Sequence, residues 1–261
     1  MDIIHAIVLG VIEGVTEFLP VSSTGHMIIA SQLMHVPDTE FLKTFEIAIQ
    51  LGAIGAVAGL YWRTFLLDWE VVAKVAAAFV PTAVIGFLLY KLIKHYLMGN
   101  PLVVIWSLLL GGAGIILFEL FYKPKENTVN ELAKISYPQA VLIGLCQSLA
   151  VIPGVSRSAA TILGGLMLGV SRRTIVEFSF LLAVPTMLAA TVLDIMKTEA
   201  SLDASEWGVL AVGFAVAFVV AWLSVKFLLK YIQRHNFMAF GIYRVIAAVV
   251  FAWLILHGGQ G

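Results

Sequence analysis

Charge is scarce in this sequence, and the two signs are balanced. Only 12% of the 261 residues are charged, with 16 Lys and Arg against 16 Asp and Glu, so the formal net charge is zero. A soluble domain normally carries about a quarter charged residues, so the composition excludes an ordinary soluble globular protein. Because there is no excess of positive charge, we also expect no nucleic-acid partner.

Cysteine is nearly absent: Cys146 is the only one, so no disulfide can form within the chain. The N-terminal segment lacks a basic region and a small-residue cleavage site, and we expect no secretory signal peptide. The alternation of apolar and polar residues that is typical of membrane β-barrels is missing too. Since no stretch suggests a separate soluble domain, we treat residues 1–261 as a single integral membrane domain.

Long apolar segments make up most of the chain, which is 61% hydrophobic and has a mean hydropathy of +0.98. Backbone in lipid must satisfy its own hydrogen bonds, so these segments are expected to be helices, and a spanning helix needs about 20 apolar residues. The sequence therefore predicts an all-α polytopic membrane protein with six transmembrane helices. They are expected at roughly 41–62, 74–93, 102–122, 175–196, 208–229 and 238–256.

Two further apolar segments, 3–34 and 138–171, are interrupted by polar residues near their middle. The first contains EGVTEFLPVSSTGH, with Pro20, and the second contains GLCQSLAVIPGVSRSAAT, with Pro153 followed by Gly154. Each is about as long as two half-helices joined by a break. We expect each to be a re-entrant helix–break–helix hairpin that enters and leaves on the same side of the membrane.

The distribution of Lys and Arg agrees with this topology. If the N-terminus is outside and both hairpins return to their own side, ten positive residues fall in inside loops and four in outside loops, as the positive-inside rule requires. The inside residues are Arg63, Lys74, Lys123, Lys125, Lys134, Arg172, Arg173, Lys226, Lys230 and Arg234. The outside residues are Lys43, Lys91, Lys94 and Lys197.

The two halves of the chain resemble each other. An offset of 134 residues pairs Glu13 with Gln147, and each half has a hairpin followed by three spans. Because three is an odd number, the second half must be inverted relative to the first. We predict an inverted-topology repeat, with halves of approximately 1–122 and 136–256, whose two breaks face each other near the middle of the membrane. Chance similarity between apolar segments is the alternative.

Glu13 and Glu17 lie four residues apart and therefore share one face of the first half-helix. A pair of buried carboxylates is unstable unless one takes a proton or a positive group joins them. A divalent cation would supply that charge, and so would a nearby arginine. A protonated glutamate packed against a helix, or a pair exposed at the interface, is the structural alternative.

Hydroxyl groups follow the first break. After Pro20, the residues Ser22, Ser23 and Thr24 stand at the start of a helix, where free N–H groups and the helix dipole favour an anion. Capping of that helix is their alternative role. His26 lies within helical reach of Ser22 or Ser23. A hydroxyl beside an imidazole and a carboxylate is the set needed for an activated nucleophile, although a lone membrane histidine more often bonds a neighbouring helix.

The second break has the same design with the opposite charge. Ser156, Arg157 and Ser158 open the next half-helix, and Thr161 follows one turn later. A guanidinium, hydroxyl groups and free amides together suit a phosphate. Pairing of Arg157 with a glutamate of the first hairpin is the alternative. With both breaks brought together, the sequence predicts a site for a phosphate or diphosphate carried on a lipid.

Other polar residues in the apolar segments are less informative. Gln50 and Gln147 could reach the site, and Asp194 and Arg244 are expected to anchor helix ends or to form a structural pair. Cys146 is expected to pack as a small apolar side chain.

Four motifs carry a resemblance to a known family. EGVTEFLPVSSTGH, TFEIAIQLG, PGVSRSAAT and EFSFLLAVP resemble, in order, the motifs of undecaprenyl-diphosphatases of the bacitracin-resistance type. The resemblance implies hydrolysis of undecaprenyl diphosphate to undecaprenyl phosphate and inorganic phosphate. That reaction recycles a lipid carrier for cell-wall polymers and reduces sensitivity to bacitracin. A divalent cation and an outward-facing site in the bacterial plasma membrane are also implied.

The resemblance matches individual residues to the family's motifs, and it does not settle the order of duties among the hydroxyl groups. The predicted catalytic residues are Glu17, Ser23, His26 and Arg157. The predicted substrate-binding residues are Ser22, Thr24, Ser156, Ser158 and Thr161. Glu13 and Glu17 match the paired-glutamate motif and are predicted ligands of Mg²⁺ or Ca²⁺.

The sequence leaves the nucleophile open between Ser23, His26 and water. The expected partners are a polyprenyl diphosphate substrate, membrane lipid and, as a homodimer, a second copy of the chain. Inverted repeats with broken helices are also the architecture of transporters, so a lipid-phosphate flippase or an anion transporter is the rival function. A structural membrane protein, whose polar residues only join helices, is the third reading.

Overall fold

The computed structural model describes residues 1–92, 97, 100–123, 128–195 and 204–258. Within these residues the chain is almost entirely helical, with one isolated parallel bridge between Val129 and Val170. The helices are α1 (Ile3–Thr16), α2 (Ser23–Leu33), α3 (Glu40–Leu60), α4 (Trp62–Leu67), α5 (Trp69–Leu92), α6 (Pro101–Phe121), the 3₁₀ helix η2 (Leu132–Lys134), α7 (Tyr137–Gln147), the 3₁₀ helix η3 (Ser148–Val151), α8 (Arg157–Met167), α9 (Arg172–Ile195), α10 (Ala204–Tyr231) and α11 (Met238–Gly258).

Six helices in the described part of the chain are long and apolar enough to cross a membrane: α3, α5, α6, α9, α10 and α11. Each covers one of the six predicted spans, so the predicted class, an all-α polytopic membrane protein, is confirmed. The predicted span ends at 93 and 196 lie outside the described residues, as do Lys94, Lys125 and Lys197.

The start of α5 differs most from the prediction. The helix begins at Trp69 rather than near residue 74, because the carboxylate of Asp68 accepts a hydrogen bond from the Val71 N–H at 3.1 Å and caps the first turn. The charge of Lys74, which suggested a loop, is met by Glu70 at 2.6 Å. The short helix α4 was not predicted.

The first hairpin breaks around Pro20. Proline has no N–H and its ring would clash with the carbonyl group four residues earlier, which belongs to Thr16, and α1 ends there. The helix resumes at Ser23. Just before it, Ser22 has a φ of 73°, a left-handed conformation that is uncommon for a residue with a side chain.

The second hairpin breaks around Gly154. Its α7 tightens into the 3₁₀ helix η3 before the break, and α8 begins at Arg157. Gly154 has a φ of 87°, and a Cβ atom there would lie 2.9 Å from the carbonyl oxygen of Val104 in α6. Glycine therefore meets two demands at once, a left-handed backbone and a close approach to α6.

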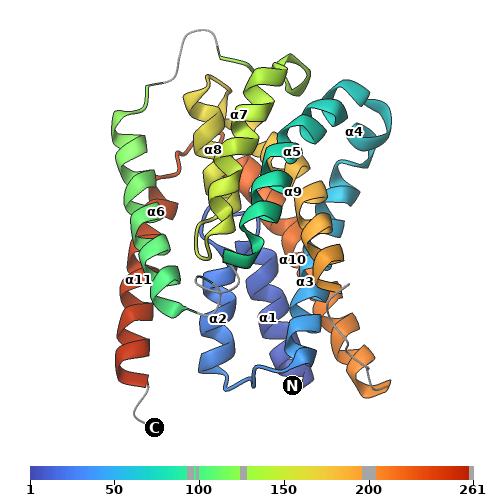
Figure 1. Ribbon diagram of the computed structural model, residues 1–261, viewed down its shortest axis with the longest axis vertical. Coiled ribbons are helices and arrows are strands. Elements are labelled where there is room, and N and C mark those ends of the chain that lie inside the picture. Colours follow the sequence, from blue (N-terminus) through green and yellow to red (C-terminus); the bar gives the residue numbers. More distant parts are fainter. Residues whose placement is uncertain (93–96, 98–99, 124–127, 196–203, 259–261) are drawn as a thin grey trace.

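The hairpins point toward each other. In Figure 1 the outer ends of α1 and α2 lie at one end of the molecule, those of α7 and α8 lie near the other, and the breaks meet between them. The helix–break–helix arrangement is thus present in both segments. That the hairpins are re-entrant in a membrane stays a prediction.

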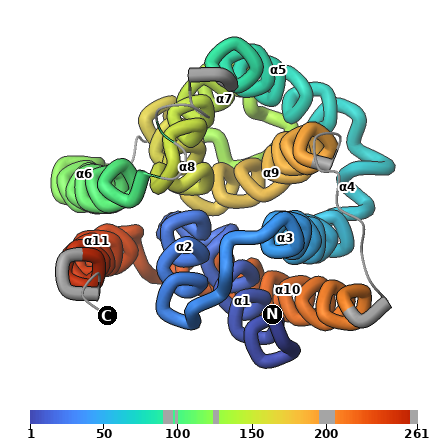
Figure 2. The backbone as a smooth tube through the Cα atoms, turned by 60° about the horizontal axis from the view of Figure 1, so that its bottom comes forward, coloured from blue at the N-terminus to red at the C-terminus, as the bar shows by residue number. Residues whose placement is uncertain are grey.

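Several helix contacts in the first half of the chain have counterparts in the second half. If α1, α3, α5 and α6 correspond to α7, α9, α10 and α11, the contact of α1 with α10 matches that of α7 with α5, and the contact of α3 with α10 matches that of α9 with α5. The contacts of α3 with α9 and of α6 with α11 each join two corresponding helices. Figure 2 shows α1, α2, α3 and α10 together on one side, α5, α7, α8 and α9 on the other, and α6 beside α11. Phe45 and Phe178, which occupy related positions, are both fully buried. The boundaries of the repeat, 1–122 and 136–256, stay a prediction.

Candidate active site

The two breaks meet at Glu17 and Arg157. Nη2 of Arg157 lies 3.2 Å from Oε1 of Glu17, and the two side chains are only 11% and 8% exposed. Nη1 of Arg157 donates to the carbonyl oxygen of Ser179 at 3.0 Å, and the guanidinium lies over the ring of Phe18, 5.7 Å from its centre. The arginine–glutamate pairing that the sequence allowed is therefore present, and it joins the hairpins.

Ser23 uses the other oxygen of the same carboxylate. Its Oγ donates to Oε2 of Glu17 at 2.5 Å. Glu17 thus connects the hydroxyl group on the first turn of α2 to the guanidinium on the first turn of α8. A carboxylate that accepts a hydrogen bond from a hydroxyl group is placed to accept its proton when that hydroxyl attacks.

His26 is held by two other partners. Its Nδ1 lies 2.7 Å from the carbonyl oxygen of Ser22, and its Nε2 lies 2.6 Å from the hydroxyl group of Tyr243. Because a carbonyl oxygen can only accept, Nδ1 carries the proton and Nε2 accepts from Tyr243. The predicted pairing of the imidazole with Ser23 is absent from the described contacts, and Glu17 takes that place.

The first turn of α8 fastens the second break to the first. Ser156, which was predicted to bind substrate, caps the helix by accepting from the Ala159 N–H at 3.2 Å. The hydroxyl group of Ser158 donates to the carbonyl oxygen of Phe18 at 2.8 Å, and Thr161 lies 2.6 Å from the hydroxyl group of Ser179. Ser158 and Thr161 are fully buried, so both hydroxyl groups are engaged within the protein.

The first turn of α2 is different. Ser22 stands at the N-cap position, but its side chain makes no capping hydrogen bond. Capping serines normally have an extended backbone, and Ser22 has a φ of 73° and a ψ of 96°, so the alternative role of capping does not apply to this residue. Thr24 is exposed. The amide groups at the start of α2 are thus left without a cap from Ser22.

Comparison with known proteins shows the family of this chain. The family model described as bacitracin resistance protein BacA matches residues 6–250. The chain belongs to the BacA family. Relatives named undecaprenyl-diphosphatase from Sulfurihydrogenibium sp. (strain YO3AOP1) and Aquifex aeolicus (strain VF5) are 48% and 47% identical to it, over 96% and 97% of this chain and 98% of each relative. A third, from Persephonella marina (strain DSM 14350 / EX-H1), is 48% identical over 98% of this chain and 100% of the relative.

In this BacA family member, Glu13 lies beside the site. It is 5% exposed, its side chain has no hydrogen bond or ion pair within the described residues, and its carboxyl group is close enough to Glu17, Glu46 and Arg157 to interact electrostatically. No group of three His, Cys, Asp or Glu residues in the described ranges could hold a metal ion. Magnesium, however, is commonly bound by one or two carboxylates and substrate phosphates, and Glu13 with Glu17 fits that pattern.

Two residues that could have reached the site bond elsewhere. The amide nitrogen of Gln147 donates to the hydroxyl groups of Thr82 and Thr186, both at 3.0 Å. The amide oxygen of Gln50 lies 3.5 Å from the hydroxyl group of Thr191. In this family member the counterpart of Glu13 in the second half is therefore a structural polar residue.

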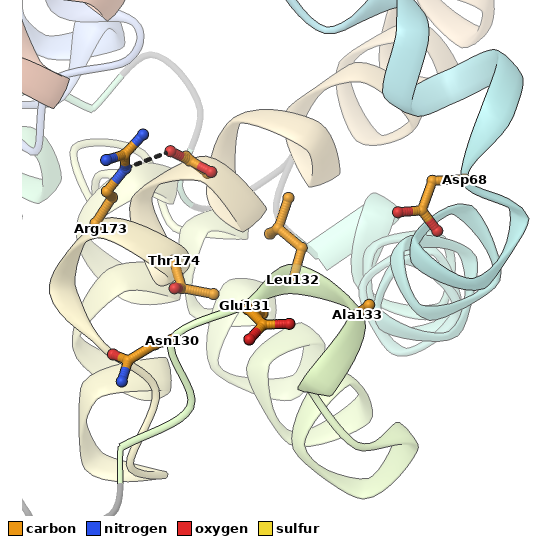
Figure 3. A pocket seen from close by; sticks show the side chains of 8 residues that line it. Asp68, Asn130, Glu131, Leu132, Ala133, Arg173 and Thr174 are labelled. Carbon is orange, nitrogen blue, oxygen red and sulfur yellow. Dashed lines mark hydrogen bonds and ion pairs between the residues drawn. The ribbon is translucent and has the colours of Figure 1, made fainter.

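A cavity of about 390 Å³ lies apart from both breaks. Figure 3 shows Asp68, Glu131 and Arg173 around it. Its charged groups already have partners, since Arg173 lies 2.9 Å from Glu177 and Glu131 lies 2.6 Å from Lys134. The cavity is not a candidate active site.

The sequence alone did not identify two residues of the site in this BacA protein. Tyr243 bonds His26 from α11, and the backbone of Ser179 positions Arg157 from α9. For Tyr243 a signal existed, because it precedes Arg244 in a spanning segment where polar residues are rarely without a role. For Ser179 the contact is through a carbonyl oxygen, which any residue type supplies.

Proposed function

We propose that this chain hydrolyses undecaprenyl diphosphate to undecaprenyl phosphate and inorganic phosphate. The reaction returns a lipid carrier to cell-wall synthesis and lowers sensitivity to bacitracin. The observation that carries the proposal is the continuous contact from Ser23 through Glu17 to Arg157, assembled from both breaks of a BacA family chain. A hydroxyl group, a carboxylate and a guanidinium in this order suit the attack of a nucleophile on a phosphate.

The phosphate groups bind between the two breaks in this proposal. Nε of Arg157 is buried and has no acceptor within the described residues, so it is available to an anion. The uncapped amides of α2 add donors with a favourable dipole. Ser22, Thr24 and Ser156 stand at these helix starts and are proposed substrate contacts. The isoprenoid tail remains in lipid.

Ser158 and Thr161 take a supporting part rather than the predicted direct contact. Both are fully buried, and their hydroxyl groups bond the backbone of Phe18 and the side chain of Ser179. They hold α8 against the first hairpin and against α9, and so support Arg157.

The proposed reaction has two steps. In the first, Oγ of Ser23 bonds to the terminal phosphorus, Glu17 accepts the hydroxyl proton, and the bond to the leaving undecaprenyl phosphate breaks. In the second, water attacks the phosphoserine, the bond to Oγ breaks, inorganic phosphate leaves, and Ser23 regains a proton. Arg157 stabilises the negative charge of the transferring phosphoryl group in both steps. His26 lies one helical turn from Ser23. We propose that it assists the reaction of Ser23 while its hydrogen bond with Tyr243 holds the imidazole in place.

A divalent cation, Mg²⁺ or Ca²⁺, is part of the proposal. Glu13 and Glu17 would hold it, because Glu13 is a buried carboxylate without a donor in the described residues. The cation would neutralise charge on the diphosphate.

The charge distribution supports an outward-facing site. The predicted topology assigns ten positive residues to the inner side of the membrane and four to the outer side, so the positive-inside rule favours a position of the outer ends of α1 and α2 outside the bacterial plasma membrane. The substrate would enter from the outer leaflet. A homodimer is not needed for this site, because both halves come from one chain.

Phosphate release by the purified protein in detergent tests the proposal. We expect release from undecaprenyl diphosphate, its loss on chelation with recovery on adding Mg²⁺ or Ca²⁺, and its loss in Glu17→Ala and Arg157→Ala. Detergent removes sidedness, so a flippase or an anion transporter without hydrolytic activity would release no phosphate. Release that is unaffected by both substitutions would refute the site.

A further inference from the structure

Arg244 is the largest fully buried side chain in the described part of the chain. It lies within α11 and is 1% exposed, so it does not anchor a helix end as the sequence suggested. A buried guanidinium is costly unless its donors are satisfied. The described contacts include no ion pair for Arg244, and backbone carbonyl groups meet its charge instead.

The carbonyl groups that bind Arg244 come from both breaks. Nη2 donates to the oxygen of Gly154 at 3.1 Å, and Nη1 donates to the oxygen of Pro20 at 3.5 Å. Nη2 also donates to Ser107 of α6 at 2.9 Å. One guanidinium thus joins the loop before Ser23, the loop before Arg157 and the helix beside them. Carbonyl groups in a break have no helical partner, so an external donor is what fixes them.

The neighbouring helix makes room for this guanidinium. A Cβ atom at Gly111 of α6 would lie 2.3 Å from Nη2 and 2.9 Å from Cζ of Arg244. Any side chain at Gly111 would push the guanidinium out of its place. At Gly114, on the same helix, a Cβ atom would meet nothing within 4 Å.

We propose that Arg244 is a positioning residue, which sets the distance between the two breaks and so holds Ser23 and Glu17 opposite Arg157. This inference rests on the proposed function of those three residues. Arg244 touches the backbone of both breaks and does not enter the chemistry. Tyr243, its neighbour on α11, holds His26, so a single turn of α11 supports both hairpins. A small displacement of the reacting groups lowers the rate of the chemical step much more than it lowers the affinity for substrate.

Gly111→Ala tests the proposal against Gly114→Ala, the same change on the same helix. We expect Gly111→Ala to lower kcat for phosphate release about 10- to 100-fold, with KM changed by less than about threefold. Gly114→Ala should keep the wild-type kcat. Arg244→Met should lose at least as much as Gly111→Ala, and Arg244→Lys should recover part of the loss.

A double variant separates positioning from general damage. Because both changes act through one guanidinium, Gly111→Ala combined with Arg244→Met should lose no more kcat than Arg244→Met alone. Full activity of Gly111→Ala, or losses that multiply in the double variant, would overturn the proposal. Ser23→Ala and Glu17→Gln serve as reference variants. If they are inactive while Gly111→Ala is fully active, the positioning role of Arg244 is refuted and the proposed function stands. If they are active too, the proposed function of the site is refuted.

Discussion

Glu17 divides its two carboxylate oxygens between two helices. One oxygen accepts from Ser23 on α2 and the other pairs with Arg157 on α8. Because the guanidinium fixes the carboxylate, the hydroxyl group of Ser23 has a single oriented acceptor. This arrangement explains why a chain keeps ionisable groups in its most apolar surroundings: they neutralise one another until an anion arrives.

Replacement of Ser23 by alanine tests the role of that hydroxyl group. We expect Ser23→Ala to lower kcat for phosphate release by more than about 1,000-fold, because the nucleophile is gone. Ser224→Ala is a matched control, since it is the same change at a serine of another helix, where the hydroxyl group donates to the carbonyl oxygen of Val220 in its own helix. If Ser23→Ala kept a rate within tenfold of the control, Ser23 would not be the nucleophile.

Tyr243 provides a milder test at the same scale. Tyr243→Phe removes the hydroxyl group that bonds Nε2 of His26 at 2.6 Å and leaves the stacked ring in place. We expect kcat to fall about tenfold, with the fold unchanged by circular dichroism. An unchanged kcat would mean that the histidine serves only to pack α2.

The sequence allowed the pairing of Arg157 with a glutamate of the first hairpin, but it did not identify the partners of His26. Residue types and family motifs indicated Glu17, Ser23 and Arg157. Spacing alone permitted His26 to bond Ser23, because residues three apart in a helix are neighbours. The left-handed φ of Ser22 and the contact with Tyr243 turn the imidazole elsewhere, and neither is visible in a local pattern.

The breaks are the elements on which the site depends. Proline positions predicted both of them, and the structure has both. The prediction placed the end of the first half-helix at Pro20, whereas α1 ends at Thr16, because the proline ring excludes helix at the carbonyl group four residues before it. The early start of α5 could not be predicted either, because the charge of Lys74 suggested a loop and one of its partners, the carbonyl group of Ala133, is distant in sequence.

Replacement of Gly154 tests the conformation of the second break. Gly154→Ala would place a Cβ atom 2.9 Å from the carbonyl oxygen of Val104 while the backbone has a φ of 87°, so we expect a loss of about 1–3 kcal/mol in the free energy of unfolding and a lower kcat. Gly208→Ala, where a Cβ atom meets nothing within 4 Å, should be harmless. Thermal unfolding in detergent compares them, and equal melting temperatures would contradict the account of this turn.

Over the whole molecule, a second charged pair joins helices far from the site. Arg172 at the start of α9 makes a bidentate pair with Glu119 of α6, in which Nη2 lies 2.6 Å from Oε2. The same carboxylate accepts from the backbone N–H of Phe237 at 3.0 Å, and the Glu119 side chain is 1% exposed. The pair therefore ties α6, α9 and the turn before α11 together.

Glu119→Gln should destabilise the protein without entering the reaction. Leaving Arg172 without its partner is expected to cost about 3–5 kcal/mol, whereas Glu131→Gln breaks a pair that is 61–68% exposed and should cost less than about 1 kcal/mol. Melting temperatures of the two variants measure the difference. A Glu119→Gln protein as stable as Glu131→Gln would show that the pair adds nothing to helix packing.

The central claim is that Ser23 attacks the terminal phosphorus. The most direct measurement is to mix the protein with undecaprenyl diphosphate labelled in its terminal phosphate, quench with denaturant at neutral pH within milliseconds, and locate the label by mass spectrometry. The account predicts phosphoserine at position 23, absent from Ser23→Ala. Label on His26, or turnover without any labelled residue, would contradict it.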